Sequence, residues 1–174
     1  MAYSIALLRG INVSGKNKIP MADLKALFES LGCDSVSTYL QSGNVGFESR
    51  QAITGQTITQ AIQDQLGLEV PALILTQSEL KDLAENNPFL NDEGADPAHC
   101  YLTFLWDTPS DQQAAALETP TNETGRFSIS GNSVYVHCPN GYGRTKIHTV
   151  FFEKKLDTLA TTRNWKTVNA LHSL

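Results

Sequence analysis

The chain has 174 residues, enough for one domain or two small subdomains, and 41% of them are hydrophobic and 18% charged, as in ordinary globular proteins. No run of about 18 apolar residues is present, which argues against a membrane span, and we expect no secretory signal. The net charge of −5 argues against bulk nucleic-acid binding. Three isolated cysteines favour free thiols and a cytoplasmic location over a disulfide framework.

The charges are unevenly distributed along the chain. Residues 1–18 carry three cations and no acid, and residues 126–174 carry a net charge of about +5. Residues 61–123 carry a net charge of about −11. If the basic ends meet in space, they create a positive field on an acidic protein; otherwise they are solvated faces of opposite sign.

The first half of the chain shows a split βαβ pattern. Strands are predicted at 3–8, 36–40, 45–47 and 70–75, with a hairpin turn at 41–44. Helical periodicity predicts one helix over 20–31, ended by Gly32, and a second through Ile58, Ile62 and Leu66, ended by Gly67. The resulting order β-α-β-β-α-β is ferredoxin-like.

A polar connector separates the two halves. Thr76 and Glu79 form a predicted capping box that opens a helix to about residue 86. Residues 87–98 follow, polar and interrupted by proline and glycine. We therefore divide the chain into a first subdomain at 1–76, a helix and connector at 77–98, and a second subdomain at 99–174.

The second half repeats the pattern. Strands are predicted at 101–106, 127–129 and 134–137, with a helix over 108–117 capped by Thr108 and another marked by Ile147, Val150 and Phe151. The turn Ser130-Gly131-Asn132 repeats the tripeptide Ser42-Gly43-Asn44. A last helix over 164–171 is expected to replace the fourth strand. The prediction is an α+β protein of two ferredoxin-like halves from an internal duplication, plus a C-terminal helix.

A cationic loop follows the first strand. Residues Gly10 to Asn17 nearly match the phosphate loop Gly-x4-Gly-Lys-[Ser/Thr], but Asn17 has no hydroxyl for Mg²⁺ and Pro20 delays the helix start. We therefore expect no hydrolysis of nucleoside triphosphates. A glycine-bearing, cationic loop before a helix still favours binding of an anion, and the alternative is a solvated flexible loop.

Two further segments, 139–146 and 161–166, have the same cationic character before a helix. In the split βαβ order the first two strands are parallel, so the loop at 9–18 should face the turn at 41–44. We therefore predict binding of a small anionic, phosphate-bearing ligand by residues of these segments. They are Arg9, Asn12, Lys16, Lys18, Gln41, Ser42, Asn44, Arg144, Lys146, Arg163 and Asn164.

Other chemistry is poorly supported by the spacing. His99-Cys100 and His137-Cys138 lie at strand ends, where neighbouring side chains point to opposite faces, so we predict no metal and no cofactor. No catalytic arrangement stands out, and whether the protein is an enzyme stays open. Tyr142 and Trp165 lie beside cations, so one alternative is single-stranded nucleic-acid binding, which the net acidity disfavours. Another is a protein-interaction module without a pocket.

Three motifs resemble a known bacterial family. The segments Leu7-Leu8-Arg9-Gly10-Ile11-Asn12-Val13, Tyr39-Leu40-Gln41-Ser42-Gly43-Asn44-Val45 and Ala160-Thr161-Thr162-Arg163-Asn164-Trp165 are similar to those of domain of unknown function 1697. The resemblance covers nearly the whole chain. It implies a small α/β protein of two ferredoxin-like halves. It supplies no established activity and no catalytic residues.

Overall fold

The computed structural model describes residues 2–174, which form two units. The first contains the chain up to Asp82 and the terminal residues Ala170–Leu174, and the second contains Leu83–Asn169. Each unit is built on one four-stranded antiparallel sheet with helices between the strands. The predicted fold class is therefore confirmed.

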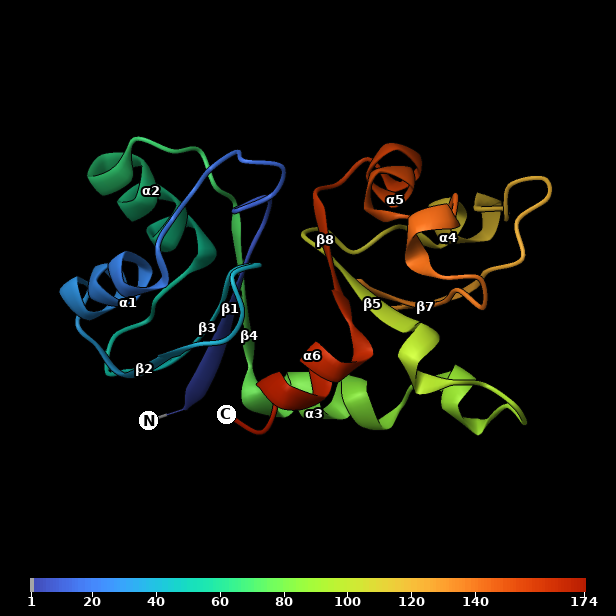
Figure 1. The fold of residues 1–174 in the computed structure, drawn as a ribbon, viewed down its shortest axis with the longest axis horizontal. Coiled ribbons are helices and arrows are strands. Elements are labelled where there is room, and N and C mark those ends of the chain that lie inside the picture. The colour runs from blue at the N-terminus through green and yellow to red at the C-terminus, as the bar shows by residue number, and fades with distance from the viewer. Residues whose placement is uncertain (1) are drawn as a thin grey trace. The chain divides into compact units, whose positions relative to one another are not determined.

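The first sheet has the strand order β2-β3-β1-β4, in which all neighbours are antiparallel. This order follows from the predicted β-α-β-β-α-β sequence of elements. Helices α1 and α2 lie on one face of the sheet (Figure 1). The elements are β1 (Tyr3–Leu8), α1 (Met21–Ser30), β2 (Cys33–Thr38), β3 (Asn44–Ser49), α2 (Gly55–Leu66) and β4 (Ala72–Thr76).

Apolar periodicity explains how α1 and α2 pack on this sheet. Leu24 and Phe28 of α1 and Ile58 and Ile62 of α2 are buried at helical spacing in one core cluster. Phe28 contacts Phe47 of β3, with ring centroids 5.3 Å apart. These buried residues pack both helices onto the same core cluster of the sheet.

The segment after β4 begins with the predicted capping box. The Thr76 hydroxyl accepts a hydrogen bond from the Glu79 N–H at 3.1 Å, and the Glu79 carboxylate accepts one from the Thr76 N–H at 2.8 Å. This arrangement opens α3 (Gln77–Glu85). The polar connector then contains two short 3₁₀ turns, η1 (Pro88–Asn91) and η2 (Pro97–His99).

The second sheet has the strand order β6-β7-β5-β8, which repeats the topology of the first. Helices α4 and α5 lie on one face of this sheet (Figure 1). The elements are β5 (Cys100–Leu105), α4 (Asp111–Ala116), β6 (Arg126–Ser130), β7 (Ser133–His137), η3 (Tyr142–Arg144), α5 (Thr149–Leu156), β8 (Ala160–Asn164) and α6 (Trp165–Leu171).

Strand β8 corrects the expectation that the last helix replaces the fourth strand. It pairs with β5 from Ala160 opposite Leu105 to Asn164 opposite Tyr101, and α6 begins immediately afterwards. The Asn164 side chain does act as a helix cap, since it accepts a hydrogen bond from the Thr167 N–H at 2.8 Å. The cap signal is therefore real, and the short strand before it is fixed by pairing with β5.

The expected cap of α4 is also wrong. Ser110 caps this helix, because its hydroxyl accepts the Gln113 N–H at 3.1 Å while Gln113 accepts the Ser110 N–H at 3.0 Å. The helix therefore begins at Asp111, two residues after the proline that was expected at its first position.

The repeated Ser-Gly-Asn tripeptide does not occupy equivalent positions in the two sheets. Leu8 N–H donates to the Gly43 carbonyl at 2.9 Å, whereas Leu105 N–H donates to the Asn132 carbonyl at 2.8 Å. Gly43 thus corresponds to Asn132, and the tripeptides are offset by one residue. The two halves are therefore related by their shared strand order, and the Ser-Gly-Asn match does not contribute to that relationship.

Candidate functional site

The loop between β1 and α1 is an ordered miniature hairpin. The Asn12 N–H donates to the Asn17 carbonyl at 3.2 Å, and the Lys16 N–H donates to the Val13 carbonyl at 2.9 Å. Ser14 and Gly15 both have positive φ, as in a type I′ turn. These backbone bonds give the loop a defined hairpin conformation, while Val13 to Lys16 are exposed to solvent.

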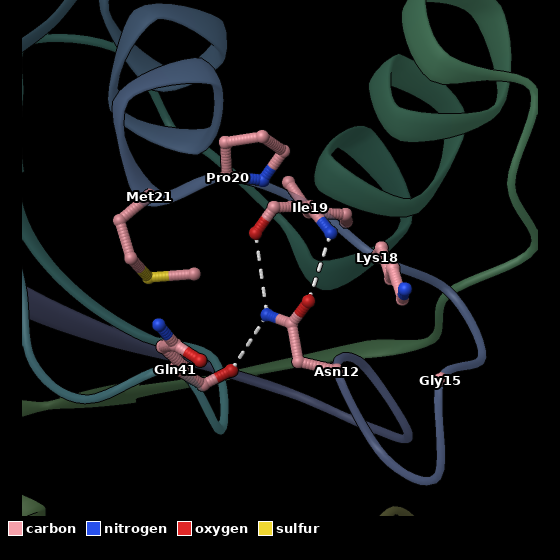
Figure 2. Close-up of a pocket in the computed structure, with 7 residues that line it drawn as sticks. All are labelled: Asn12, Gly15, Lys18, Ile19, Pro20, Met21 and Gln41. Carbon is pink, nitrogen blue, oxygen red and sulfur yellow. Dashed lines mark hydrogen bonds between the residues drawn. The ribbon is translucent and has the colours of Figure 1, made fainter.

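The Asn12 side chain ties this loop to two other segments (Figure 2). Its Nδ2 donates to the carbonyl oxygens of Gln41 at 2.8 Å and Ile19 at 3.2 Å, and its Oδ1 accepts the Ile19 N–H at 3.0 Å. Asn12 has a φ of 54°, a backbone region that asparagine tolerates better than most residues. This amide therefore holds together the loop, the turn after β2 and the approach to α1.

Gly43 fixes the turn after β2 against the same loop. It has a φ of 91°, and a Cβ at this position would lie 2.8 Å from both Ile11 Cδ1 and Leu8 Cβ. No larger residue fits without displacing this packing. Together with the Asn12 bond, this contact confirms that residues 9–18 face the turn at 41–44.

A cavity of about 320 Å³ opens where these three segments meet, at the start of α1 (Figure 2). Among the described residues that line it there is one cation, Lys18, and no acid. The other lining groups are amide, glycine and apolar side chains. The lining residues are Asn12, Gly15, Lys18, Ile19, Pro20, Met21 and Gln41.

Three predicted residues thus line one cavity, and four lining residues were missed by sequence reasoning. Gly15, Ile19, Pro20 and Met21 carry no charge, so a search for anion-binding side chains passes over them. A signal was present, because Ile19 and Pro20 mark the point where the loop enters the helix. Residues immediately before a helix start are exposed to its N-terminal positive dipole end.

The other predicted residues of the first unit lie outside this lining. Arg9 is half-buried directly after β1, where its backbone N–H donates to the Pro71 carbonyl at 2.9 Å. Lys16 is exposed at the end of the type I′ turn. Asn44 is fully buried and donates to the Tyr39 carbonyl at 2.7 Å and to the Ser42 hydroxyl at 3.1 Å. The Ser42 and Asn44 side chains therefore stabilise the turn.

In the second unit, Arg144 and Lys146 line a smaller cavity of about 170 Å³. A carboxylate of the chain lies in it, because Glu123 accepts the backbone N–H groups of Lys146 and Gly125 at 2.6 and 2.8 Å. The Lys146 N–H bond holds the pKa of the Glu123 carboxyl below its usual range. The Lys146 ammonium donates to the Thr121 carbonyl at 2.8 Å. This cationic loop therefore binds an anion of its own chain.

Arg163 is a buried residue of β8, with 6% of its surface exposed. Its guanidinium donates to the Thr161 hydroxyl at 2.6 Å and to the Thr162 carbonyl at 3.0 Å. Burial lowers the pKa of Arg163 to about 10. The meeting of Arg163 and Asn164 with the cations of the first unit stays a prediction.

Within residues 2–174, no group of three or more His, Cys, Asp or Glu side chains is placed to hold a metal ion. Cys33, Cys100 and Cys138 are buried free thiols, and burial raises the pKa of each, which disfavours the nucleophilic thiolate. The helices of the described chain are too short or too polar to cross a bilayer.

Comparisons with known proteins identify relatives of the chain but no activity. The family model described as "Protein of unknown function (DUF1697)" matches residues 1–135. A comparison with curated proteins found no match. Among solved structures, the chain is similar to "conserved bacterial protein SP0830 from Streptococcus pneumoniae", with a TM-score of 0.67 and 23% identity. That similarity covers 99% of this chain and 97% of the other, and it supports the fold.

Proposed function

The chain belongs to the DUF1697 family of proteins of unknown function, and we propose that it binds a small anionic, phosphate-bearing ligand in the cavity at the start of α1. The observation that carries this proposal is the charge of the lining, which includes Lys18 and no acid among the described residues. An ammonium in such a lining favours an anion over a neutral or cationic ligand.

The N-terminus of α1 supports the same ligand charge. Pro20 precedes the helix and provides no side-chain cap, and the first N–H groups of any helix lack partners within it. The helix dipole adds a partial positive charge at this end. Lys18 and the helix start therefore act in the same direction.

The order of the loop supports a preformed site. Buried Ile11 and Ile19 anchor the loop near both ends, and Asn12 bonds it to the turn after β2. Binding then requires little further ordering of the backbone, which lowers the entropic cost of association.

We propose in addition that the protein is cytoplasmic. The buried free thiols of both units support this location, because reduced cysteines are typical of cytoplasmic proteins.

We propose that Arg9 and Lys16, on the same loop, add to the positive field. We do not assign the ligand to Arg144 or Lys146, because Glu123 is bound at that loop. The single-site hypothesis further proposes that Arg163 and Asn164 contribute to the same site.

Titration calorimetry with inorganic phosphate, at low and at physiological salt, tests the proposal. Lys18→Ala should weaken saturable binding about tenfold or more, which is the range of one charge-assisted hydrogen bond. Lys25→Ala is the matched control, since it removes the same charge from an exposed position of α1 that pairs with Glu29 at 3.9 Å. Absence of saturable binding, or equal binding by both variants, would contradict the proposal.

A further inference from the structure

The cavity at the start of α1 is chemically different at its two sides. Lys18 lies on one side, whereas the Met21 and Gln41 side chains lie on the other, with Asn12 between them (Figure 2). A ligand that uses both sides therefore needs an anionic end and a second end of different chemistry. This inference rests on the function proposed above.

Met21 gives the second side an apolar surface. It is half-buried and packs against the core cluster of the first unit, so its thioether has a fixed support. Ile19 and Pro20 continue the apolar lining. Thioethers make favourable contacts with aromatic rings, which suits a flat ring against Met21.

Gln41 gives the same side an exposed amide. Its backbone carbonyl is held by Asn12, while its side chain is exposed at the cavity. A glutamine amide offers a donor and an acceptor in one plane, which matches the edge of a nucleobase. The Asn12 amide makes three bonds to the backbone, so Gln41 is the lining amide that can turn toward a ligand.

We propose that the ligand is a nucleoside monophosphate, with its phosphate at Lys18, its base against Met21 and the base edge at Gln41. The volume of about 320 Å³ lies at the small end of the range of ligand cavities, about 300 to 1,000 Å³, and suits one nucleotide. One lysine in the lining suits a single phosphate group better than a triphosphate.

Calorimetric titrations with adenosine monophosphate, adenosine and inorganic phosphate test this proposal. The monophosphate should bind at least about tenfold more tightly than inorganic phosphate, because the base adds contacts. Gln41→Ala should weaken binding of the monophosphate by about three- to tenfold and leave phosphate binding unchanged. Lys18→Ala should weaken the binding of both the monophosphate and inorganic phosphate. Gln51→Ala, a control at an exposed glutamine after β3, should change neither affinity.

The outcomes separate this proposal from the function on which it rests. The nucleotide assignment would be overturned if phosphate binding depends on Lys18 but adenosine monophosphate binds no more tightly than inorganic phosphate. That outcome would leave the proposed anion binding intact. Equal losses in Gln41→Ala and Gln51→Ala would overturn it as well. If neither phosphate nor the monophosphate binds, both proposals fail.

Discussion

The side chain of Asn12 and the backbone of Gln41 are joined by a hydrogen bond of 2.8 Å between Nδ2 and the carbonyl oxygen. These two positions lie 29 residues apart in the sequence, with α1 and β2 between them. The bond closes one side of the cavity, because both residues line it. The shape of the cavity therefore depends on Asn12, whose side-chain amide makes its hydrogen bonds to backbone groups.

Replacing Asn12 should destabilise the first unit in two separable steps. Asn12→Gly keeps the positive φ but loses three hydrogen bonds, and we expect a loss of about 2 kcal/mol in the free energy of unfolding. Asn12→Ala should cost about 1 kcal/mol more, because alanine tolerates this φ poorly. Urea unfolding measures both losses.

Asn17→Gly is the matched control for this experiment. It also has positive φ but loses one hydrogen bond, from Nδ2 to the Gly10 carbonyl at 3.1 Å. We expect a loss of about 1 kcal/mol or less. Stability of Asn12→Gly equal to that of the unmodified protein would show that the Asn12 bonds do not hold the loop.

Substitution of Gly43 should be far more damaging than that of Gly131. The new Cβ in Gly43→Ala would lie 2.8 Å from Ile11 Cδ1 and Leu8 Cβ, at a φ of 91°. We therefore expect a loss of about 3 kcal/mol in the free energy of unfolding. Gly131→Ala has a φ of 57° and no heavy atom within 4 Å, so about 1 kcal/mol is expected. Thermal or urea unfolding of both variants gives the comparison, and equal losses would refute it.

The sheet order could be predicted because it depends on local patterns. Short, mostly apolar runs define the strands, and Gly67 at a φ of 68° ends α2 as its sequence position indicates. The prediction that the cationic loop faces the turn at 41–44 follows from the parallel direction of the first two strands. The strands and the end of α2 are visible in short windows of sequence, whereas this facing follows from the order of the elements.

The errors at β8, Arg163 and Met21 concern features that depend on tertiary partners. Strand β8 contains Thr161 and Arg163, and its pairing with β5 outweighs a sequence that looks like a helix cap. The burial of Arg163 follows from that pairing and has no local signature. Met21 lines the cavity only because the loop packs over the helix start, and no pattern in the sequence marks it.

The near-match to a phosphate loop should have no hydrolytic activity. The Asn17 amide donates to the Gly10 carbonyl and offers no hydroxyl to Mg²⁺, and α1 begins only at Met21. We expect no Mg²⁺-dependent release of phosphate from ATP or GTP, and Asn17→Thr should not create it. A phosphate-release assay decides this, and turnover that disappears in Lys16→Ala would prove the expectation wrong.

Acid should destabilise the second unit through His137. This side chain is buried on β7 against Phe89, with ring centroids 5.9 Å apart, and its Nδ1 has no hydrogen-bond partner in the described chain. Burial, with the nearby positive charge of Arg126, lowers the pKa of His137. The Arg126 guanidinium stays beside this cluster through its ion pair with Asp92 at 2.9 Å.

The sign of the pH effect follows from proton binding. Below the unfolded-state pKa of about 6.5, the unfolded chain binds a proton that the folded chain resists, so stability falls as the pH falls. The loss ends once the pH has passed the lowered folded-state pKa. His137→Phe removes this titration while keeping a ring against Phe89, so its stability should fall less than that of the unmodified protein between pH 7.5 and pH 5. Urea unfolding at several pH values across this window measures the difference, and parallel curves for the two proteins would show that His137 is not the group responsible.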